Sequence, residues 1–166
     1  ARDPNGNEDP SPAEMLIDVD TIPPSPPTGL AVTPREDGAI VEMRWDPVAD
    51  ANGGYNVYRS PQEAFDRANA ELIVPSIQNT RTSDRPIRSE RSKTVFYHVT
   101  ALDRSENESE PSAPQSVEVL GDVEIREKEF RKLIEQVNDL MRLKQWNEVA
   151  NLSKNTPDPP TGFEGY

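Results

Sequence analysis

Three stretches in which apolar and polar residues alternate limit the folds open to this chain more than any other feature. Because successive side chains of a β-strand point to opposite faces, this alternation predicts strands with one buried face. Short strands at close spacing leave no room for crossover helices, so we predict a mainly β, seven-stranded antiparallel sandwich over residues 26–120. The residues predicted to face inward are Val41, Met43, Trp45, Tyr55, Val57, Val95, Tyr97, Val99 and Ala101, with Val117 and Val119 on a last strand.

The same stretches carry ordered motifs. They are Trp45 followed by Asp-Pro, the segment Gly-Tyr-Asn-Val-Tyr-Arg-Ser at 54–60, and the segment 97–109, which starts Tyr-His-Val-Thr-Ala-Leu-Asp. Together they resemble a fibronectin type III domain, and this resemblance implies an immunoglobulin-like sandwich that serves in holding, spacing or binding. Val95 and Glu106 stand where that family usually has a tyrosine and a glycine. No Arg-Gly-Asp occurs, so adhesion to integrins through that motif is not supported.

The middle of the predicted sandwich is less regular. Residues 65–72 predict a short helical excursion, and residues 73–77 predict brief strands. Tyr58, Phe96 and His98 have the opposite parity to the core positions of their strands. We therefore expect these three side chains either on a contact surface or beneath the C-terminal helical segment.

Composition sets limits on size and partners. With 166 residues, a hydrophobic fraction of 33% and 17 prolines, the chain has room for one modest core plus appendages. A formal charge of −12 argues against nucleic acid and anionic membranes as partners, because both attract Lys and Arg. The absence of cysteine excludes disulfides, thiolate metal sites and cysteine nucleophiles. We expect neutral, basic or metal-ion partners.

The start of the chain and its apolar content bear on location. The chain has no run of about 18 apolar residues, which is the pattern that predicts a membrane span. Ala1 rather than Met at the first position fits a processed, exported protein, which we favour, and also fits a trimmed chain. We expect a bacterial protein that is exported to the periplasm, the cell surface or the extracellular space, with any membrane association made through a partner.

Three appendages flank the predicted sandwich. Residues 1–25 are rich in Asp, Glu and Pro and predict a disordered acidic tether. Residues 121–154 predict an amphipathic helical segment. Residues 155–166 form a tail rich in Pro and Gly, with aromatic side chains that suit a partner's groove.

The helical segment carries a wide apolar stripe. Apolar residues recur at three- and four-residue steps after Gly121, and Asp122 can cap the helix. The pattern restarts near Trp146, so one helix or a helical hairpin both fit. A stripe this wide must be buried against a partner protein, against the sandwich's own sheet, or against a second copy as a homodimer. The predicted partner-binding residues are Phe130, Leu133, Ile134, Val137, Leu140, Met141, Trp146, Phe163 and Tyr166.

Residue patterns for catalysis and cofactor binding are missing. No nucleophile elbow, phosphate-binding glycine loop or zinc spacing occurs, so we expect no enzyme activity and no cofactor. The one histidine, His98, lies in a predicted strand, which is typical of a surface or interface residue. In the family's topology two loops rich in carboxylates meet at one end of the sandwich, and oxygen ligands suit Ca²⁺. The weak calcium candidates are Asp50, Asn52, Asp103 and Asn107.

These observations favour one function and keep an alternative. We expect a non-catalytic structural or accessory subunit that mediates protein–protein interaction in a bacterial envelope or extracellular complex. The alternative is a carbohydrate-binding or spacer module that serves an extracellular glycan-degrading enzyme. Exposed aromatic side chains that stack on sugars would favour the alternative.

Overall fold

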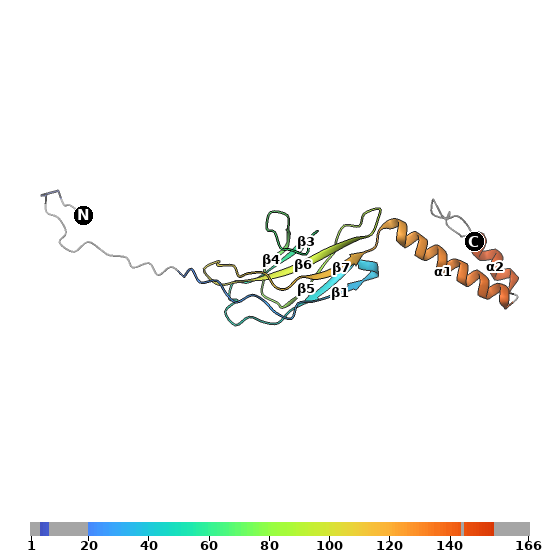
Figure 1. The fold of residues 1–166 in the computed structure, drawn as a ribbon, viewed down its shortest axis with the longest axis horizontal. Helices are drawn as coiled ribbons and strands as arrows, with labels where there is room; N and C mark the ends of the chain where they lie inside the picture. The colour runs from blue at the N-terminus through green and yellow to red at the C-terminus, as the bar shows by residue number, and fades with distance from the viewer. Residues whose placement is uncertain (1–3, 7–19, 144, 155–166) are drawn as a thin grey trace.

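Two antiparallel sheets and a helical extension make up the fold (Figure 1). The computed structural model describes residues 4–6, 20–143 and 145–154. The mainly β, seven-stranded sandwich followed by helix is confirmed. The strands are β1 (Ala31–Arg35), β2 (Ile40–Arg44), β3 (Gly54–Ser60), β4 (Glu71–Ile77), β5 (Arg81–Asp84), β6 (Lys93–Leu102) and β7 (Gln115–Val119), and a 3-10 turn (Glu36–Gly38) joins β1 to β2.

The strands divide between the sheets in a Greek-key-like order. One sheet has the order β1-β2-β5 and the other the order β4-β3-β6-β7. All pairings between named strands are antiparallel. Pro34 lies in β1, an edge strand, which is the position where a missing backbone N–H is tolerated. The end of the sandwich at which residues 20–30 enter is opposite to the end from which the helices leave (Figure 1).

The core lies between the two sheets and consists of Leu30 and the inward residues predicted from the alternation. Every one of those side chains is buried. Trp45, directly after β2, is 4% exposed, and its ring meets that of Tyr55 edge-on at a centroid distance of 5.5 Å. Edge-to-face contact adds to the large apolar area that each aromatic ring buries, so this pair is central to the sandwich.

The outer face of the β4-β3-β6-β7 sheet is covered around Tyr58 and His98, which corrects the expectation of an open contact surface at these residues. Tyr58 is buried and His98 is 1% exposed, while Phe96 is half-buried. The cover is the loop of residues 61–70 rather than the C-terminal helices. Phe65 of this loop lies against Tyr58 and His98 at ring-centroid distances of 5.2 and 5.1 Å.

The covering loop is a turn, which corrects the predicted helical excursion. The carbonyl oxygen of Asp66 accepts hydrogen bonds from the backbone N–H groups of Asn69 and Ala70, and its carboxylate accepts one from Ala68 at 3.0 Å. An aspartate that bonds the backbone just after it favours a turn over a helix. The brief strands expected at residues 73–77 are one strand, β4, with register shifts opposite β3.

Glu106 gives a first prediction, on stability. Its φ is 64°, in the left-handed region that favours glycine. We expect Glu106→Gly to raise the free energy of unfolding by up to about 1 kcal/mol, because relief of left-handed strain exceeds the added chain entropy. Ser105→Gly is the control in the same turn: Ser105 has no positive φ and should lose about 0.5–1 kcal/mol. Urea denaturation measures both, and equal losses would contradict the argument.

Candidate interaction site

The C-terminal part of the chain forms a helical hairpin, which decides between the two predicted alternatives. Helix α1 spans Asp122–Arg142 and helix α2 spans Trp146–Lys154. The turn between them is closed by backbone hydrogen bonds from Leu143 to Asp139 and from Gln145 to Leu140, each 3.0 Å long. Within the ranges 20–143 and 145–154, neither helix combines the length and apolar character that a bilayer crossing requires.

The base of α1 is bonded to the sandwich. Its N-cap is Gly121, and no side chain caps the helix, which corrects the expectation that Asp122 does so. The free N–H groups of the first turn are satisfied by the loop before β6 instead: Asp122 donates to the Ser89 carbonyl and Val123 to the Glu90 carbonyl, both at 3.1 Å. The direction in which α1 leaves the sandwich is therefore set by backbone hydrogen bonds.

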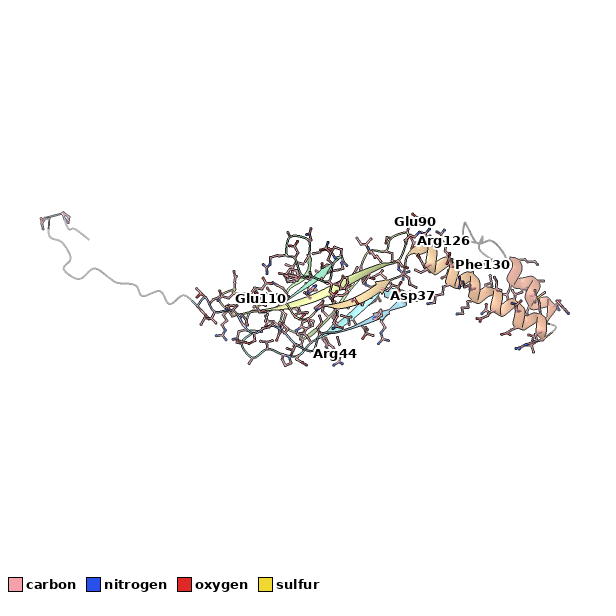
Figure 2. The ribbon with its side chains drawn as sticks, in the orientation of Figure 1. Asp37, Arg44, Glu90, Glu110, Arg126 and Phe130 are labelled. Atoms are coloured by element: carbon pink, nitrogen blue, oxygen red, sulfur yellow. The ribbon has the colours of Figure 1, made fainter. Side chains whose placement is uncertain are left out.

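Close packing and charge reinforce this junction. A Cβ atom at Gly121 would lie 2.3 Å from the carbonyl carbon of Arg91, an approach that only glycine permits. About two helical turns further on, Lys128 pairs with Asp37 of the 3-10 turn. Asp37 and Glu90 lie on either side of the base of α1 (Figure 2). Beyond its base, the hairpin extends away from the sandwich along the long axis of the molecule (Figure 1).

The apolar stripe of the hairpin is open along one edge. No side chain of α1 is buried. Ile134 and Met141 are 40% and 45% exposed, and Trp146 at the start of α2 is 59% exposed. Leu143, at 64% exposed, belongs to the same surface but was absent from the predicted set, although its place at the end of the periodic pattern was a usable signal. The half-buried members are Phe130, Leu133, Val137 and Leu140.

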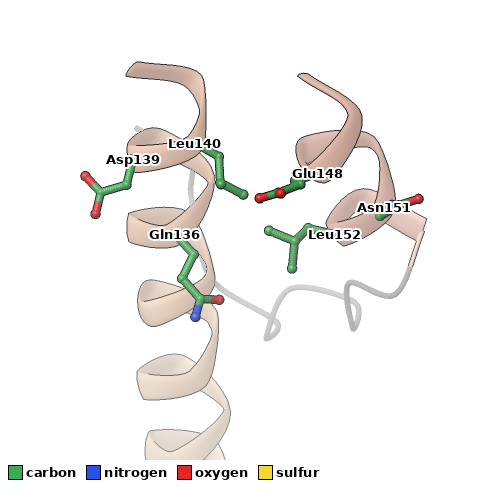
Figure 3. A pocket seen from close by; sticks show the side chains of 6 residues that line it. All are labelled: Gln136, Asp139, Leu140, Glu148, Asn151 and Leu152. Carbon is green, nitrogen blue, oxygen red and sulfur yellow. The ribbon is translucent and has the colours of Figure 1, made fainter. Parts of the chain in front are cut away.

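Helix α2 covers the other edge of the stripe. A groove of about 530 Å³ runs between the helices, and Leu140 and Leu152 point toward one another across it (Figure 3). Its remaining lining residues are Gln136, Asp139, Glu148 and Asn151. Ile134 and Met141 lie outside this groove, and α2 has only 9 residues against 21 in α1. The hairpin thus closes part of its own stripe and leaves the edge of Ile134 and Met141 free. Phe163 and Tyr166 lie outside the described residues.

The calcium candidates lie at one end of the sandwich. The carboxylate of Asp103 accepts hydrogen bonds from Ser105 and Asn107, between 2.7 and 2.9 Å. Burial would raise the pKa of Asp103, but these bonds outweigh it and hold the pKa below its ordinary value. Asn52 donates to the carbonyl of Asp50 instead. In the part of the chain that the structure describes, no three His, Asp or Glu side chains gather to hold a metal ion. Calcium binding stays a prediction.

A hydrogen-bonded cluster fastens the covering loop to the sheet. The carboxylate of Glu108 accepts bonds from the Tyr58 hydroxyl at 2.8 Å and the Thr100 hydroxyl at 2.6 Å, and it pairs with Arg67 of the loop. Burial raises the pKa of Glu108, yet the bonds from Thr100, Arg67 and Tyr58 outweigh that effect and keep the pKa low. Because Glu108 is ionised and fully engaged, this cluster works as a clamp rather than as a proton donor or acceptor.

His98 lies beside this clamp without a polar partner of its own. In the described structure neither ring nitrogen makes a hydrogen bond. Burial is the main influence on the pKa of His98 and lowers it, and the Ser112 backbone, which lies too far off or at too poor an angle for a hydrogen bond to the ring, opposes that shift only in part. The imidazole is therefore held neutral, because a charge here would be desolvated and unpaired.

This burial predicts a pH dependence of stability. The pKa of His98 is lower in the folded protein than its value of about 6.5 in the unfolded chain, so the unfolded chain takes up the proton first as the pH falls. The free energy of unfolding is therefore kept in full above pH 6.5 and decreases below it. We expect the loss between pH 6.5 and 5 to be at most about 1.4 kcal/mol per pH unit. Urea denaturation at pH 7.5 and 5.5 measures it. His98→Phe should remove the difference, and a wild-type protein equally stable at both pH values would contradict the account.

Several solved structures are similar to the sandwich. It is similar to a solved Fn3-like protein from Clostridium thermocellum, with 26% identity over 56% of this chain and 90% of that one, and a TM-score of 0.48. It is also similar to the fibronectin type III domain of human fibronectin type III domain containing protein 3, with 17% identity over 62% and 92% of the chains and a TM-score of 0.47. These two solved structures are described as Fn3-like and as a fibronectin type III domain.

A third solved structure, the FN1-FN3 domains of chicken CNTN1, has 20% identity over 59% of this chain and 31% of that one, with a TM-score of 0.47. No protein-family model matches the chain, and no curated protein matches it. The predicted resemblance to fibronectin type III domains is confirmed. These similarities describe the sandwich and say nothing about what the hairpin binds.

Proposed function

We propose that this chain is a non-catalytic accessory subunit that binds another protein through the open edge of its helical hairpin, in a bacterial envelope or extracellular complex. The observation that carries the proposal is the exposure of Ile134, Met141 and Trp146 on a hairpin whose base is fixed to the sandwich. A fibronectin type III-like sandwich suits this role because it is a compact spacer. Full burial of a large apolar side chain contributes about 1.5–3 kcal/mol, so a partner gains from covering this edge.

The charge of the chain identifies the kind of partner. The formal charge is −12, and the acids and bases of residues 122–154 balance, so the excess lies in the remainder. A second copy would bring another −12 toward the same assembly, and like net charges oppose association. The occupant that fits is therefore a different protein, neutral or basic, that offers an apolar helical surface. A bundle of three or four helices is the usual way to complete such a hairpin.

Photo-crosslinking in the producing cell tests this proposal. A photoreactive residue at position 134 should give one adduct with a second protein. The same residue at position 135, which faces away from the stripe, should give little. The adducted protein is then purified and its binding measured directly. We expect Met141→Asp to weaken binding by about tenfold to a hundredfold and Glu135→Gln to leave it unchanged. A position-134 adduct of two copies, or a partner indifferent to Met141→Asp, would contradict the proposal.

The carbohydrate-binding alternative lacks a platform in the described residues. Trp45, Tyr55 and Tyr97 lie in the core, and Trp146 is the aromatic side chain with large exposure. One exposed indole on a helical hairpin suits a protein groove better than a flat glycan chain. Export to the periplasm, the cell surface or the extracellular space remains part of our proposal, and the acidic composition is compatible with it.

A further inference from the structure

The outer face of the β1-β2-β5 sheet carries two arginines placed directly opposite one another. Arg44 of β2 and Arg81 of β5 are register partners. Register partners share a face of the sheet, and Met43 next to Arg44 points into the core, so both guanidinium groups point outward. Both side chains are exposed. Like charges directly opposite each other destabilise strand pairing, so this pair is a cost to the sandwich.

No acid of the sandwich neutralises the pair. Among the residues that the structure describes, neither guanidinium forms an ion pair or a hydrogen bond. The acid in the next row of this face, Glu42, is bound to Arg35 at 3.1 Å. The face therefore keeps two unbalanced positive charges in a chain whose formal charge is −12. Its charge is opposite to that of the rest of the molecule.

The surface is hollowed over the pair. A depression of about 630 Å³ is lined by Arg44 and Arg81, and by Thr33, Glu42 and Ser83 of the neighbouring row. The carboxylate of Glu42 in this lining is the one held by Arg35. On the side away from Arg81, the register partner of Arg44 is Ala31, whose small side chain leaves the depression open. Arg44 lies on the body of the sandwich, away from α1 (Figure 2). This site is thus separate from the open edge of the hairpin.

We propose that this face binds the carboxylates of a short acidic segment of a partner protein. A guanidinium group offers a planar fork of N–H donors that matches a carboxylate, and two opposed forks can hold one or two of them. Binding would also relieve the repulsion between Arg44 and Arg81. A long polyanion does not fit, because the surrounding acidic surface repels it. The ligand is therefore one or two acidic residues in an otherwise uncharged segment.

The test uses a blocked peptide of sequence Gly-Glu-Glu-Gly and a matched Gly-Gln-Gln-Gly peptide. Titration of the full chain is followed by NMR at the side-chain Nε–H signals of Arg44 and Arg81. We expect the Glu peptide to shift both signals, with affinity that falls as salt is added. Combined Arg44→Gln and Arg81→Gln substitution should lower the affinity by about tenfold or more, and Arg126→Gln on α1, outside this face, should change it by less than about twofold. Circular dichroism confirms that each variant is folded.

Several outcomes would overturn the inference. If the Gln peptide bound with the same affinity as the Glu peptide, the charge of the peptide would play no part. Inorganic sulfate binding where the Glu peptide does not would make this a site for small inorganic anions instead. An equal loss in Arg126→Gln would show that the overall charge of the chain, and not the pair of Arg44 and Arg81, governs binding. Met141→Asp, which tests the hairpin, should leave the peptide titration unchanged, so the two proposals fail independently.

Discussion

Replacement of Trp45 by alanine is expected to lower the free energy of unfolding by about 3–5 kcal/mol. The side chain is 4% exposed and packs edge-on against Tyr55, so its removal leaves a cavity between the sheets. Such a loss is a large share of the roughly 5–15 kcal/mol that a typical domain has. Urea denaturation followed by circular dichroism is the measurement, because Trp146 also contributes to the fluorescence of this chain.

Trp45→Phe is the matched variant. It keeps an aromatic ring in the core and removes the indole N–H, which has no hydrogen-bond partner in the described structure. A buried unpaired donor is itself unfavourable, so we expect Trp45→Phe to cost clearly less than Trp45→Ala. A loss of less than about 0.5 kcal/mol for Trp45→Ala would place this side chain in solvent and refute the packing described for the core.

Gly121→Val is the second substitution with a large expected effect. A Cβ atom at this position would lie 2.3 Å from the Arg91 carbonyl carbon, so the backbone at position 121 and the backbone at Arg91 must move apart. We expect a loss of about 2–3 kcal/mol in unfolding free energy. The hydrogen bonds from Asp122 and Val123 to the loop before β6 should weaken with it. Hydrogen exchange of these two amides should therefore become faster than in the wild-type protein.

The control for Gly121→Val is Ser116→Val, which adds a similar side chain at an exposed position of β7. That change should stay within about 0.5 kcal/mol of the wild type. If Gly121→Val were equally harmless and left the exchange of Asp122 and Val123 unchanged, the tight junction between sandwich and hairpin would be wrong.

The core was predictable because strand alternation is a local property. Val41, Met43 and Trp45 face inward in the structure as their parity required. The restart of the helical pattern at Trp146 likewise marked the second helix correctly. In both cases the period of the apolar residues alone indicates the buried face.

Features that depend on distant segments were not predictable. The parity of Tyr58 and His98 placed them correctly on the outer face, but only the folded chain shows that Phe65 covers them. The junction at Gly121 depends on Arg91, thirty positions earlier in the sequence, so the local pattern pointed to Asp122 as the cap. The pairing of Arg44 with Arg81 likewise follows from strand register and not from sequence proximity.

A distance measurement between two spin labels tests the central claim most directly, namely that the sandwich holds the hairpin outward with its stripe uncovered. The chain has no cysteine, so Ser116→Cys on β7 and Glu135→Cys on α1 label it uniquely. Pulsed electron spin resonance on this double variant should give one narrow distribution at the long separation that the extended arrangement requires. A short distance, which would mean that the hairpin packs against the sandwich, or a broad distribution without a preferred separation, would contradict the account.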